Sequence, residues 1–400
     1  MNDDLKNKEI LQNTKDTSRK TSNGMKVLIT CGIFEPDAGG PATYAPQLAR
    51  ELVSRGVEVD IITLSDNKSY DFDSKYSFKL TRVQRSNKLS NYTRMFFILL
   101  KNVKNYDLVY TLDWLTVGLP LSFASMIRRQ KYVVRVGGGY IWERYLLMGG
   151  EPMSLKAFYE KGIYKQFPIF FYLIRFVFRH AHTVIFNSII QRELFQEYYG
   201  LKPEKLDTIF NPIPSDISKV DRSDLKKEIV FAGRFIVMKN VENLIRGFAK
   251  ADLQDYTLKL LGDGPILQDI HDLVFELGIE DRVEFLPRMR RSEMYTYIKD
   301  SRYLVLPSWT DIYPMQFYEC LATGIPILLT KENYLIESSE LSVQIDPHFV
   351  EDIAEKMLYL ADETNYNEFV RKFDSIKVER GWTEITDQHM KIFEKISTRR

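Results

Sequence analysis

Cysteine is nearly absent from this chain of 400 residues, which contains only Cys31 and Cys320. The two lie far apart in the sequence and have no companions at metal-ligand spacing, so we expect neither a disulfide framework nor a zinc site. A protein that does not depend on disulfides suits a reducing compartment. We therefore expect a cytoplasmic protein.

Long apolar runs are also missing. The nearest candidate, Phe167 to Phe178, ends at Arg179 and His180, which leaves it too short to span a bilayer alone. The polar residues 1–24 contain no apolar core of signal-peptide length. We expect a disordered or loosely helical extension there, and no secretion.

An excess of either charge is missing as well. The 55 Lys and Arg residues nearly balance the 54 Asp and Glu residues, which gives a net charge of +1. This balance offers no global reason to expect nucleic acid as a partner. A hydrophobic share of 44% and a charged share of 27% are typical of globular proteins, and the length suits two domains of roughly 200 residues each.

The chain does have a regular alternation of short apolar runs and helical patterns. The first half predicts strands at residues 25–31, 57–64, 108–112, 132–136 and 183–186, and the second half at 228–232, 257–261, 282–286, 303–306 and 326–329. Strands that alternate with helices form parallel sheets with right-handed crossovers. Two such sheets leave a cleft at the carboxyl ends of their strands, where ligands bind.

The break in periodicity near residue 212 divides the chain. We predict an N-terminal domain over 25–212, a linker over 213–227, a C-terminal domain over 228–380 and a final helix within 381–400.

Two cations follow the first strand of the second series. Gly233 and Arg234 come directly after that strand, and Lys239 lies at the mouth of a helix predicted over 241–250. Cations beside a helix N-terminus can converge on one anion. The alternative is a solvated basic loop.

A glycine-containing turn follows the next strand. Gly262 and Gly264 precede Pro265, which suits the first position of a helix. Glycine there lets a base or a phosphate approach the backbone, although any strand-to-helix turn can look like this. With the two cations and the two carboxylates that come later, the turn predicts a pocket for a nucleoside diphosphate that carries a sugar.

The longest motif is PSWTDIYPMQFYECLATGIP, residues 307–326. It resembles the signature of retaining GT-B glycosyltransferases, in particular the large family four, which includes bacterial capsule, O-antigen and exopolysaccharide enzymes. These proteins carry a Glu-x7-Glu element, typically preceded by Pro-Ser and followed by Ala-x-Gly-x-Pro. Here Asp311 and Glu319 are the two acids, with seven residues between them. The resemblance covers almost all of residues 25–398 and is firm from 228 to 329.

The resemblance implies an α/β fold of the GT-B type, with two Rossmann-like domains that face each other across a cleft. A C-terminal helix that begins after Arg380-Gly381-Trp382 would cross back to the N-terminal domain. The implied reaction is metal-independent and needs no cofactor, because a nucleotide sugar is its substrate. Catalysis would rest mainly on electrostatic stabilisation of the departing diphosphate.

The resemblance also implies roles for single residues. Arg234 and Lys239 would hold the diphosphate and Glu319 the ribose hydroxyls, which a carboxylate can accept as a pair. The donor sugar would face Asp311 and the backbone of Ile312, Tyr313, Pro314 and Met315. Gly39 and Gly40 match the first glycine loop of the family, which approaches the donor phosphate or the acceptor. An alternative for Asp311 is that it caps the following helix.

The N-terminal half departs from the family pattern. Family members often place a histidine after the strand at 132–136, where this chain has three glycines and Tyr140. These glycines allow close approach of a substrate or form a mobile loop. The candidate acceptor contacts, for which loop packing is the alternative, are Asp113, Trp114, Gly138, Gly139, Tyr140 and Trp142, with Glu143 and Arg144 beside them. No histidine lies in a motif, so no general base is named.

Residues 156–180 combine many aromatic side chains with Lys and Arg. A basic, aromatic helix suggests contact with the inner surface of the cytoplasmic membrane, which would suit a polyprenol-linked saccharide acceptor. The alternative is a core helix that packs beneath the sheet.

Together these patterns and the resemblance predict a retaining glycosyltransferase that moves a sugar from a UDP- or GDP-sugar to a saccharide acceptor, in cell-surface polysaccharide or glycoconjugate biosynthesis. One alternative is a non-catalytic protein of the same fold that binds nucleotide sugars, because Asp311 replaces the first glutamate and the loop histidine is missing. Another is a nucleotide-sugar epimerase, against which the missing acid-base histidine counts.

Overall fold

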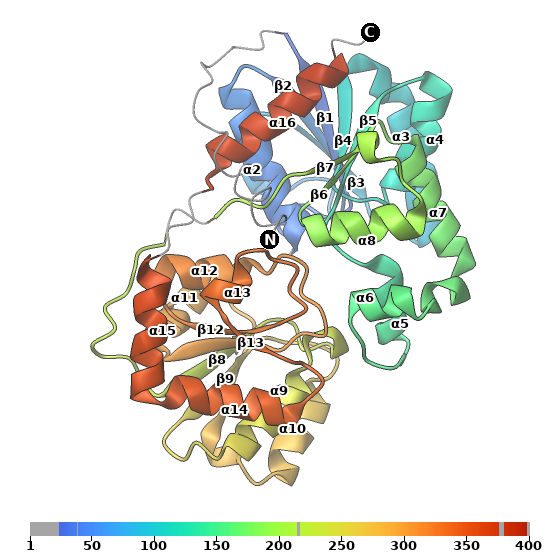
Figure 1. Ribbon diagram of the computed structural model, residues 1–400. Coiled ribbons are helices and arrows are strands. Elements are labelled where there is room, and N and C mark those ends of the chain that lie inside the picture. Colours follow the sequence, from blue (N-terminus) through green and yellow to red (C-terminus); the bar gives the residue numbers. More distant parts are fainter. Residues whose placement is uncertain (1–23, 38, 214–216, 376–379, 398–400) are drawn as a thin grey trace.

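The computed structural model describes residues 24–37, 39–213, 217–375 and 380–397. These residues form two parallel sheets, each covered by helices on both faces (Figure 1). The extension expected over residues 1–24 lies outside the described residues except for Gly24.

The N-terminal sheet has the strand order β3-β2-β1-β4-β5-β6-β7. Its strands are β1 (Lys26–Cys31), β2 (Glu58–Ser65), β3 (Lys79–Gln84), β4 (Leu108–Thr111), β5 (Tyr132–Val136), β6 (Thr183–Phe186) and β7 (Leu206–Thr208). Its helices are α2 (Gly40–Ser54), α3 (Lys88–Asn102), α4 (Gly118–Arg128), α5 (Tyr140–Leu147), α6 (Leu155–Glu160), α7 (Pro168–His180) and α8 (Ile189–Tyr199). The order reverses between β1 and β4, which places a topological switch point at the carboxyl ends of these strands.

The C-terminal sheet has the order β10-β9-β8-β11-β12-β13. Its strands are β8 (Glu228–Ala232), β9 (Thr257–Leu261), β10 (Val283–Leu286), β11 (Tyr303–Leu306), β12 (Ile327–Thr330) and β13 (Val343–Ile345). Its helices are α9 (Val241–Ala251), α10 (Leu267–Glu276), α11 (Arg291–Asp300), α12 (Met315–Thr323), α13 (Ser338–Leu341), α14 (Val350–Ala361) and α15 (Glu363–Ser375). The four central strands, β8, β9, β11 and β12, are buried on both faces, as apolar runs in a parallel sheet require.

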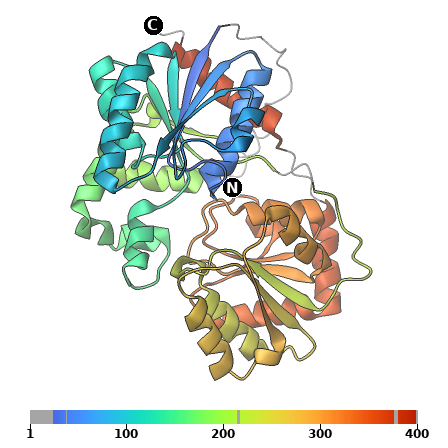
Figure 2. The same ribbon diagram turned by 180° about the vertical axis from the view of Figure 1, so that it is seen from behind.

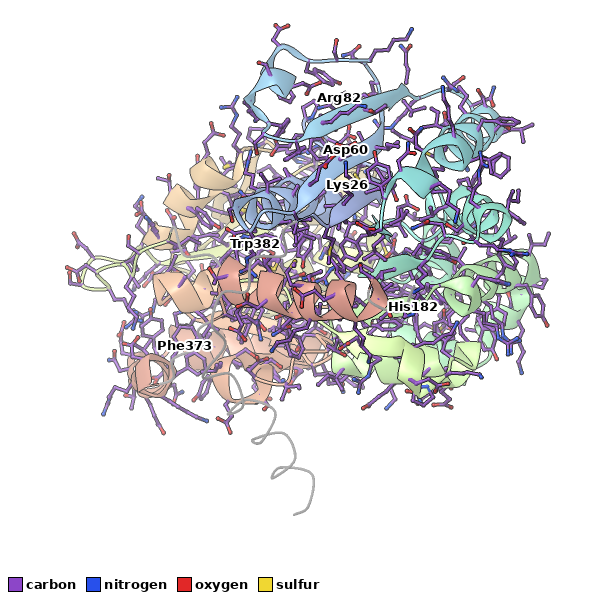
Figure 3. All side chains as sticks on the ribbon, turned by 90° about the horizontal axis from the view of Figure 1, so that it is seen from above. Lys26, Asp60, Arg82, His182, Phe373 and Trp382 are labelled. Atoms are coloured by element: carbon purple, nitrogen blue, oxygen red, sulfur yellow. The ribbon has the colours of Figure 1, made fainter. Side chains whose placement is uncertain are left out.

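The final helix, α16 (Trp382–Ser397), returns to the N-terminal domain and lies against α2 (Figure 3). Its apolar face, which includes Ile385 and Phe393, is buried in the core that the sheet forms with α2. The opposite face of the sheet packs on α3, α4, α7 and α8. The predicted GT-B architecture with a returning helix is therefore confirmed.

The segments that connect the two domains contact each other. The backbone N–H of Ile213 donates to the carbonyl of Arg380 at 2.7 Å, and Arg380 Nε donates to the carbonyl of Asn211 at 3.1 Å. The Arg380 side chain is buried over the rings of Phe210 and Tyr313, and its guanidinium also donates to the Tyr313 hydroxyl. Both chain crossings thus form one packed cluster.

The structure bears out each of the ten predicted strands to within one residue at either end. The sequence analysis missed β3, β7 and β13, of which β3 and β7 end one sheet at its two edges and β13 ends the other at one edge. The single helix considered for 156–180 is wrong, because α6 ends at Glu160, Gly162 adopts a left-handed φ of 69° and α7 begins at Pro168. In the described residues no helix has the length and apolar character that a membrane span requires.

Candidate active site

A cleft of about 890 Å³ lies between the domains at the carboxyl ends of their strands. Its N-terminal wall comes from the first turns of α2 and from the loops after β4, β5 and β6. Its C-terminal wall comes from Ile312, Tyr313, Met315 and Glu319, and Trp382 adds the start of α16. A second pocket of about 180 Å³ is continuous with the cleft, because residues of the loop after β5 and Ile312 line both.

The smaller pocket brings together Arg234, Lys239 and Asp311. Lys239 Nζ lies 2.6 Å from Asp311 Oδ2, which also accepts a hydrogen bond of 3.2 Å from the Ser308 hydroxyl. The exposed Arg234 side chain forms no hydrogen bond or ion pair with any described residue. The pocket therefore presents one oriented, paired cation and one cation that is free of described partners.

Asp311 does not cap α12, so the structure excludes that alternative. The N-cap residue is Pro314, and no side chain caps the helix. The segment before the helix is instead fixed to the loop after β12, because the backbone N–H groups of Asp311 and Tyr313 donate to Glu332 and Asn333. Tyr313 adopts a positive φ of 59°, which is rare for a bulky residue and often marks functional turns.

Glu319 lies in the second turn of α12 and lines the larger cleft. The residue is only 3% exposed. A buried carboxylate is rare unless it is paired, so its place on the cleft suits a specific contact with a ligand.

Gly262 and Gly264 owe their identity to the packing of the two βα turns, whereas a Cβ on Gly233 would meet only the ring of Phe231, at 3.2 Å. A Cβ on Gly262 would lie 1.9 Å from the Gly233 carbonyl oxygen, and one on Gly264 would lie 2.1 Å from the Phe235 carbonyl oxygen. None of the three glycines lines either described pocket. The donor contact predicted for all three stays a prediction. At Gly262 and Gly264 the close approach of the two backbones already requires glycine.

Gly39 and Gly40 begin α2 at the edge of the cleft. Gly39 is the N-cap residue with a φ of 150°, and a Cβ there would lie 2.6 Å from Ile33 Cδ1. Gly40, Pro41 and Thr43 line the cleft. The positive end of the α2 dipole therefore faces the cleft.

The glycine loop after β5 forms part of the wall of both pockets. Gly137 and Gly138 line both. The Gly138 carbonyl accepts from Gln191 Nε2 at 2.8 Å, and the Gly139 N–H donates to Glu143 Oε1 at 3.0 Å. The loop is thus braced by side chains of α5 and α8.

The structure separates the other predicted acceptor contacts into three groups. Trp114 and Tyr140 line the larger cleft. Trp142 lines the smaller pocket, and its indole N–H donates to the Met153 carbonyl at 2.8 Å. Asp113 lines neither pocket: its Oδ1 accepts from the N–H groups of Leu115 and Val117, and burial raises the pKa of its carboxyl.

Two families of known sequences match the chain in succession. The description "Glycosyltransferase Family 4" matches residues 38–217, and "Glycosyl transferases group 1" matches residues 213–374. The chain belongs to the family 4 glycosyltransferases. The two matches meet near residue 213, between the last strand of one sheet and the first strand of the other.

Individual relatives agree with this family. The chain is 25% identical over 333 residues to an uncharacterised glycosyltransferase of Methanocaldococcus jannaschii, which covers 78% of this chain and 82% of the relative. It is 26% identical over 330 residues to N-acetyl-alpha-D-glucosaminyl L-malate synthase of Bacillus anthracis, with 77% and 79% covered. A crystal structure of Anabaena HepE in complex with UDP shares the fold with a TM-score of 0.71 at 17% identity, over 93% of this chain and all of that one.

No motif predicted two buried polar residues in the N-terminal wall of this family 4 glycosyltransferase. Arg135 on β5 and Asn187 after β6 are 7% and 6% exposed, and both line the larger cleft. The signal for Arg135 was a lone charge in the apolar run YVVRV. Asn187 carried no signal, because a single Asn after a strand is typical of any turn.

His389 on α16 packs close to Arg135 but lines neither pocket. Its Nδ1–H donates to the Ile385 carbonyl at 2.8 Å, so Nε2 accepts from the Tyr110 hydroxyl at 3.0 Å. Burial, with a smaller effect from the charge of Arg135, lowers the pKa of His389 to about 3. The histidine is therefore neutral at physiological pH. Within the described ranges no three His, Cys, Asp or Glu side chains are grouped to hold a metal ion.

Proposed function

We propose that this family 4 glycosyltransferase moves a sugar from a UDP- or GDP-sugar to a saccharide acceptor with retention of configuration. The observation that carries the proposal is the smaller pocket, where Arg234 and Lys239 lie with Asp311 at the mouth of the cleft that holds Glu319. Cations here can neutralise the charge that develops on a departing diphosphate. Glu319 can accept hydrogen bonds from the vicinal ribose hydroxyls.

The two cations would act in different ways. Lys239 is oriented by Asp311, so its ammonium stays in one place as charge develops, which is the essence of preorganised electrostatic catalysis. Arg234 is free to form a bidentate pair with phosphate oxygens. In a retaining reaction of this kind the acceptor attacks on the face from which the diphosphate departs. The glycine loop after β5, which lines both pockets, would let the acceptor approach that face.

Calorimetric titration with UDP and GDP tests the nucleotide site. We expect selective micromolar binding of one nucleotide by the wild type. Glu319→Gln keeps the size of the side chain but weakens its acceptance of the ribose hydroxyls, so binding should fall by roughly ten-fold or more. Glu368→Gln, an exposed residue of α15 that lines neither pocket, is the matched control. Equal binding by Glu319→Gln and the control would remove Glu319 from the site.

A non-catalytic protein that binds nucleotide sugars is the alternative function. The ion pair between Lys239 and Asp311 favours this alternative, because the Asp311 carboxylate neutralises part of the charge that a diphosphate would need. Asp311 is also shorter than the glutamate that is usual in the family. Binding of the nucleotide sugar without transfer or hydrolysis, for any saccharide supplied, would support this alternative. Activity that survives EDTA would support the proposed metal-independent mechanism.

A lipid-linked acceptor and contact with the inner membrane surface form a second part of the proposal. The helix α7 buries one face, including Phe171 and Ile174, and exposes Ile169 and Tyr172 on the other. The exposed face continues onto α4, because the Phe176 and Phe123 rings are 5.1 Å apart. The other exposed side chains of this α4–α7 surface are Met126, Ile127, Arg128, Arg129 and Arg179. Apolar and basic residues on one surface suit an anionic bilayer.

Vesicle sedimentation tests the membrane contact. Binding to vesicles that contain anionic lipid should exceed binding to neutral vesicles, and Ile169→Glu should abolish the difference. Leu358→Glu on α14 is the control, since Leu358 is an exposed apolar residue in the other domain. Equal sedimentation of all three proteins with both vesicle types would contradict the contact.

A further inference from the structure

The N-terminal wall of the larger cleft contains one buried cation. Arg135 is on β5, where the other four strand residues, Tyr132, Val133, Val134 and Val136, are at most 1% exposed. Side chains alternate along a strand, so Arg135 projects on the face of the sheet that packs against α2 and α16. It lines the cleft at the carboxyl end of the strand, where ligands of such sheets bind.

The described partners of Arg135 are all neutral. Its Nη2 donates to the Ile209 carbonyl at 2.9 Å and to Asn211 Oδ1 at 2.8 Å, and its guanidinium lies 4.4 Å from the centre of the Tyr44 ring. His389 behind it is neutral as well. Among described residues no carboxylate lies within 4 Å of the guanidinium. A buried charge without a counter-ion is costly, and proteins usually pair it.

Two further features of the same wall suit an anionic ligand. The 15-residue helix α2 directs its N-terminus at the cleft through Gly40 and has no acidic residue in its first turn. Asn187 lines the cleft while 6% exposed, and its buried side-chain oxygen has no hydrogen-bond partner among the described residues. Arg135 pairs with Ile185 on the neighbouring strand β6, and Asn187 follows Ile185 by two residues at the carboxyl end of that strand.

We propose that Arg135 and the N-terminus of α2 bind a negatively charged group, a carboxylate or a phosphate, on the saccharide acceptor. The side-chain oxygen of Asn187 accepts a hydrogen bond from a hydroxyl of the same sugar. This site is separate from the smaller pocket of Arg234 and Lys239, which Arg135 does not line. The inference rests on the proposed function, because it assigns the acceptor side of that reaction.

Charged and neutral sugars test the proposal on the full chain. The probes are glucuronate against glucose, galacturonate against galactose, and glucose 1-phosphate against methyl glucoside, each titrated with saturating UDP or GDP present. At least one charged probe should bind roughly 10- to 100-fold more tightly than its neutral counterpart. Arg135→Met should abolish that preference, whereas Arg135→Lys should keep part of it. Equal binding within every pair, or no binding of any saccharide, would overturn the proposal.

The nucleotide distinguishes the acceptor from the donor as the source of the anion. Nucleotide affinity should be unchanged in Arg135→Met. If nucleotide affinity instead falls as much as affinity for the charged sugar, Arg135 binds the donor diphosphate and the proposal is overturned. Asn187→Asp is the second variant should Arg135→Met fail to fold, because it places a carboxylate in the wall without removing the cation. Asn187→Asp should weaken binding of the charged probe and leave binding of the neutral probe unchanged. The same sugar pairs are also titrated without nucleotide, so a wild type that prefers the charged sugar but binds no nucleotide would contradict the proposed function alone.

Discussion

The two walls of the cleft carry their charges in different ways. The C-terminal wall and the pocket beside it place Arg234 and Lys239 on loops, where Arg234 is exposed. The N-terminal wall places Arg135 within a strand with its guanidinium over the Tyr44 ring, and Trp114 and Tyr140 line the same cleft. Arg234 has no described partner and can adjust to a ligand, whereas Lys239 is held by Asp311 and Arg135 by its strand and its hydrogen bonds. We propose that the first wall serves the chemistry and the second wall the recognition of the acceptor.

Removal of Arg234 should have the largest effect and tests the role of the C-terminal wall in the chemistry. Arg234→Ala should lower turnover by roughly 10²- to 10³-fold with little change in Tm, because it removes a contact made to the leaving group in the transition state. Steady-state kinetics with the cognate donor and a melting curve measure the two effects. Arg246→Ala removes an exposed arginine of α9 that lines neither pocket, and its turnover should match the wild type. Unchanged turnover in Arg234→Ala would remove this residue from the site.

His389 tests how firmly the N-terminal wall depends on α16. A histidine whose pKa falls to about 3 in the folded protein, from 6.5 when unfolded, destabilises the fold as pH falls below about 6.5. The loss is at most about 1.4 kcal/mol per pH unit until the folded pKa is reached. His389→Gln should be less stable at pH 7 but should lose less Tm between pH 7 and pH 5. Parallel Tm curves for the two proteins would show that His389 does not cause the pH dependence.

Tyr140 sharpens the comparison on the side of recognition. Tyr140→Ala should raise the KM for the acceptor by about ten-fold and leave the KM for the donor unchanged, because it removes an aromatic surface from the N-terminal wall. Tyr140→Phe keeps the ring and should lie near the wild type. A rise in the donor KM instead would place the donor against this wall.

Asp374 provides the smallest effect and a reference for ion pairs outside the cleft. Its partners Arg222 and Lys219 hold the pKa of its carboxyl well below the ordinary value of 3.8. The pairs are partly exposed, so Asp374→Asn should cost only about 0.5 kcal/mol at pH 7, measured by denaturant titration. The difference from wild type should shrink as pH falls below about 4, because Asp374 then takes up a proton in the unfolded chain while its lower pKa keeps it ionised in the folded protein. A difference that does not change with pH would show that the charge of Asp374 is not its cause.

The strand pattern predicted both sheets because most of their strands are buried on both faces and are apolar runs in the sequence. The missed strands are three to six residues long and lie at edges, and β7 has no buried residue to mark it. The turn between α6 and α7 escaped notice because Gly162 adopts a left-handed φ inside a helical pattern.

The motifs predicted Arg234, Lys239, Asp311 and Glu319, which line the two pockets, but not how those side chains pair. Lys239 and Asp311 are 72 residues apart, and their contact depends on how the loops after two neighbouring strands meet. The need for glycine at Gly262 was assigned to a ligand, whereas the Gly233 carbonyl occupies that space. Arg135 was visible as a charge in a strand, but its neutral surroundings come from segments distant in the sequence.

The cluster around Arg380 has a mechanical consequence. Both chain crossings meet there, on one side of the molecule, while α5 and α6 reach the C-terminal domain on the opposite side (Figure 2). That far contact is made by the Leu155 N–H, which donates to Thr310 Oγ1. This arrangement suits a hinge at the cluster, because displacement in a domain rotation grows with distance from the axis. A small rotation would leave Tyr313 nearly still, while the pocket between Thr310 and the glycine loop would open and close.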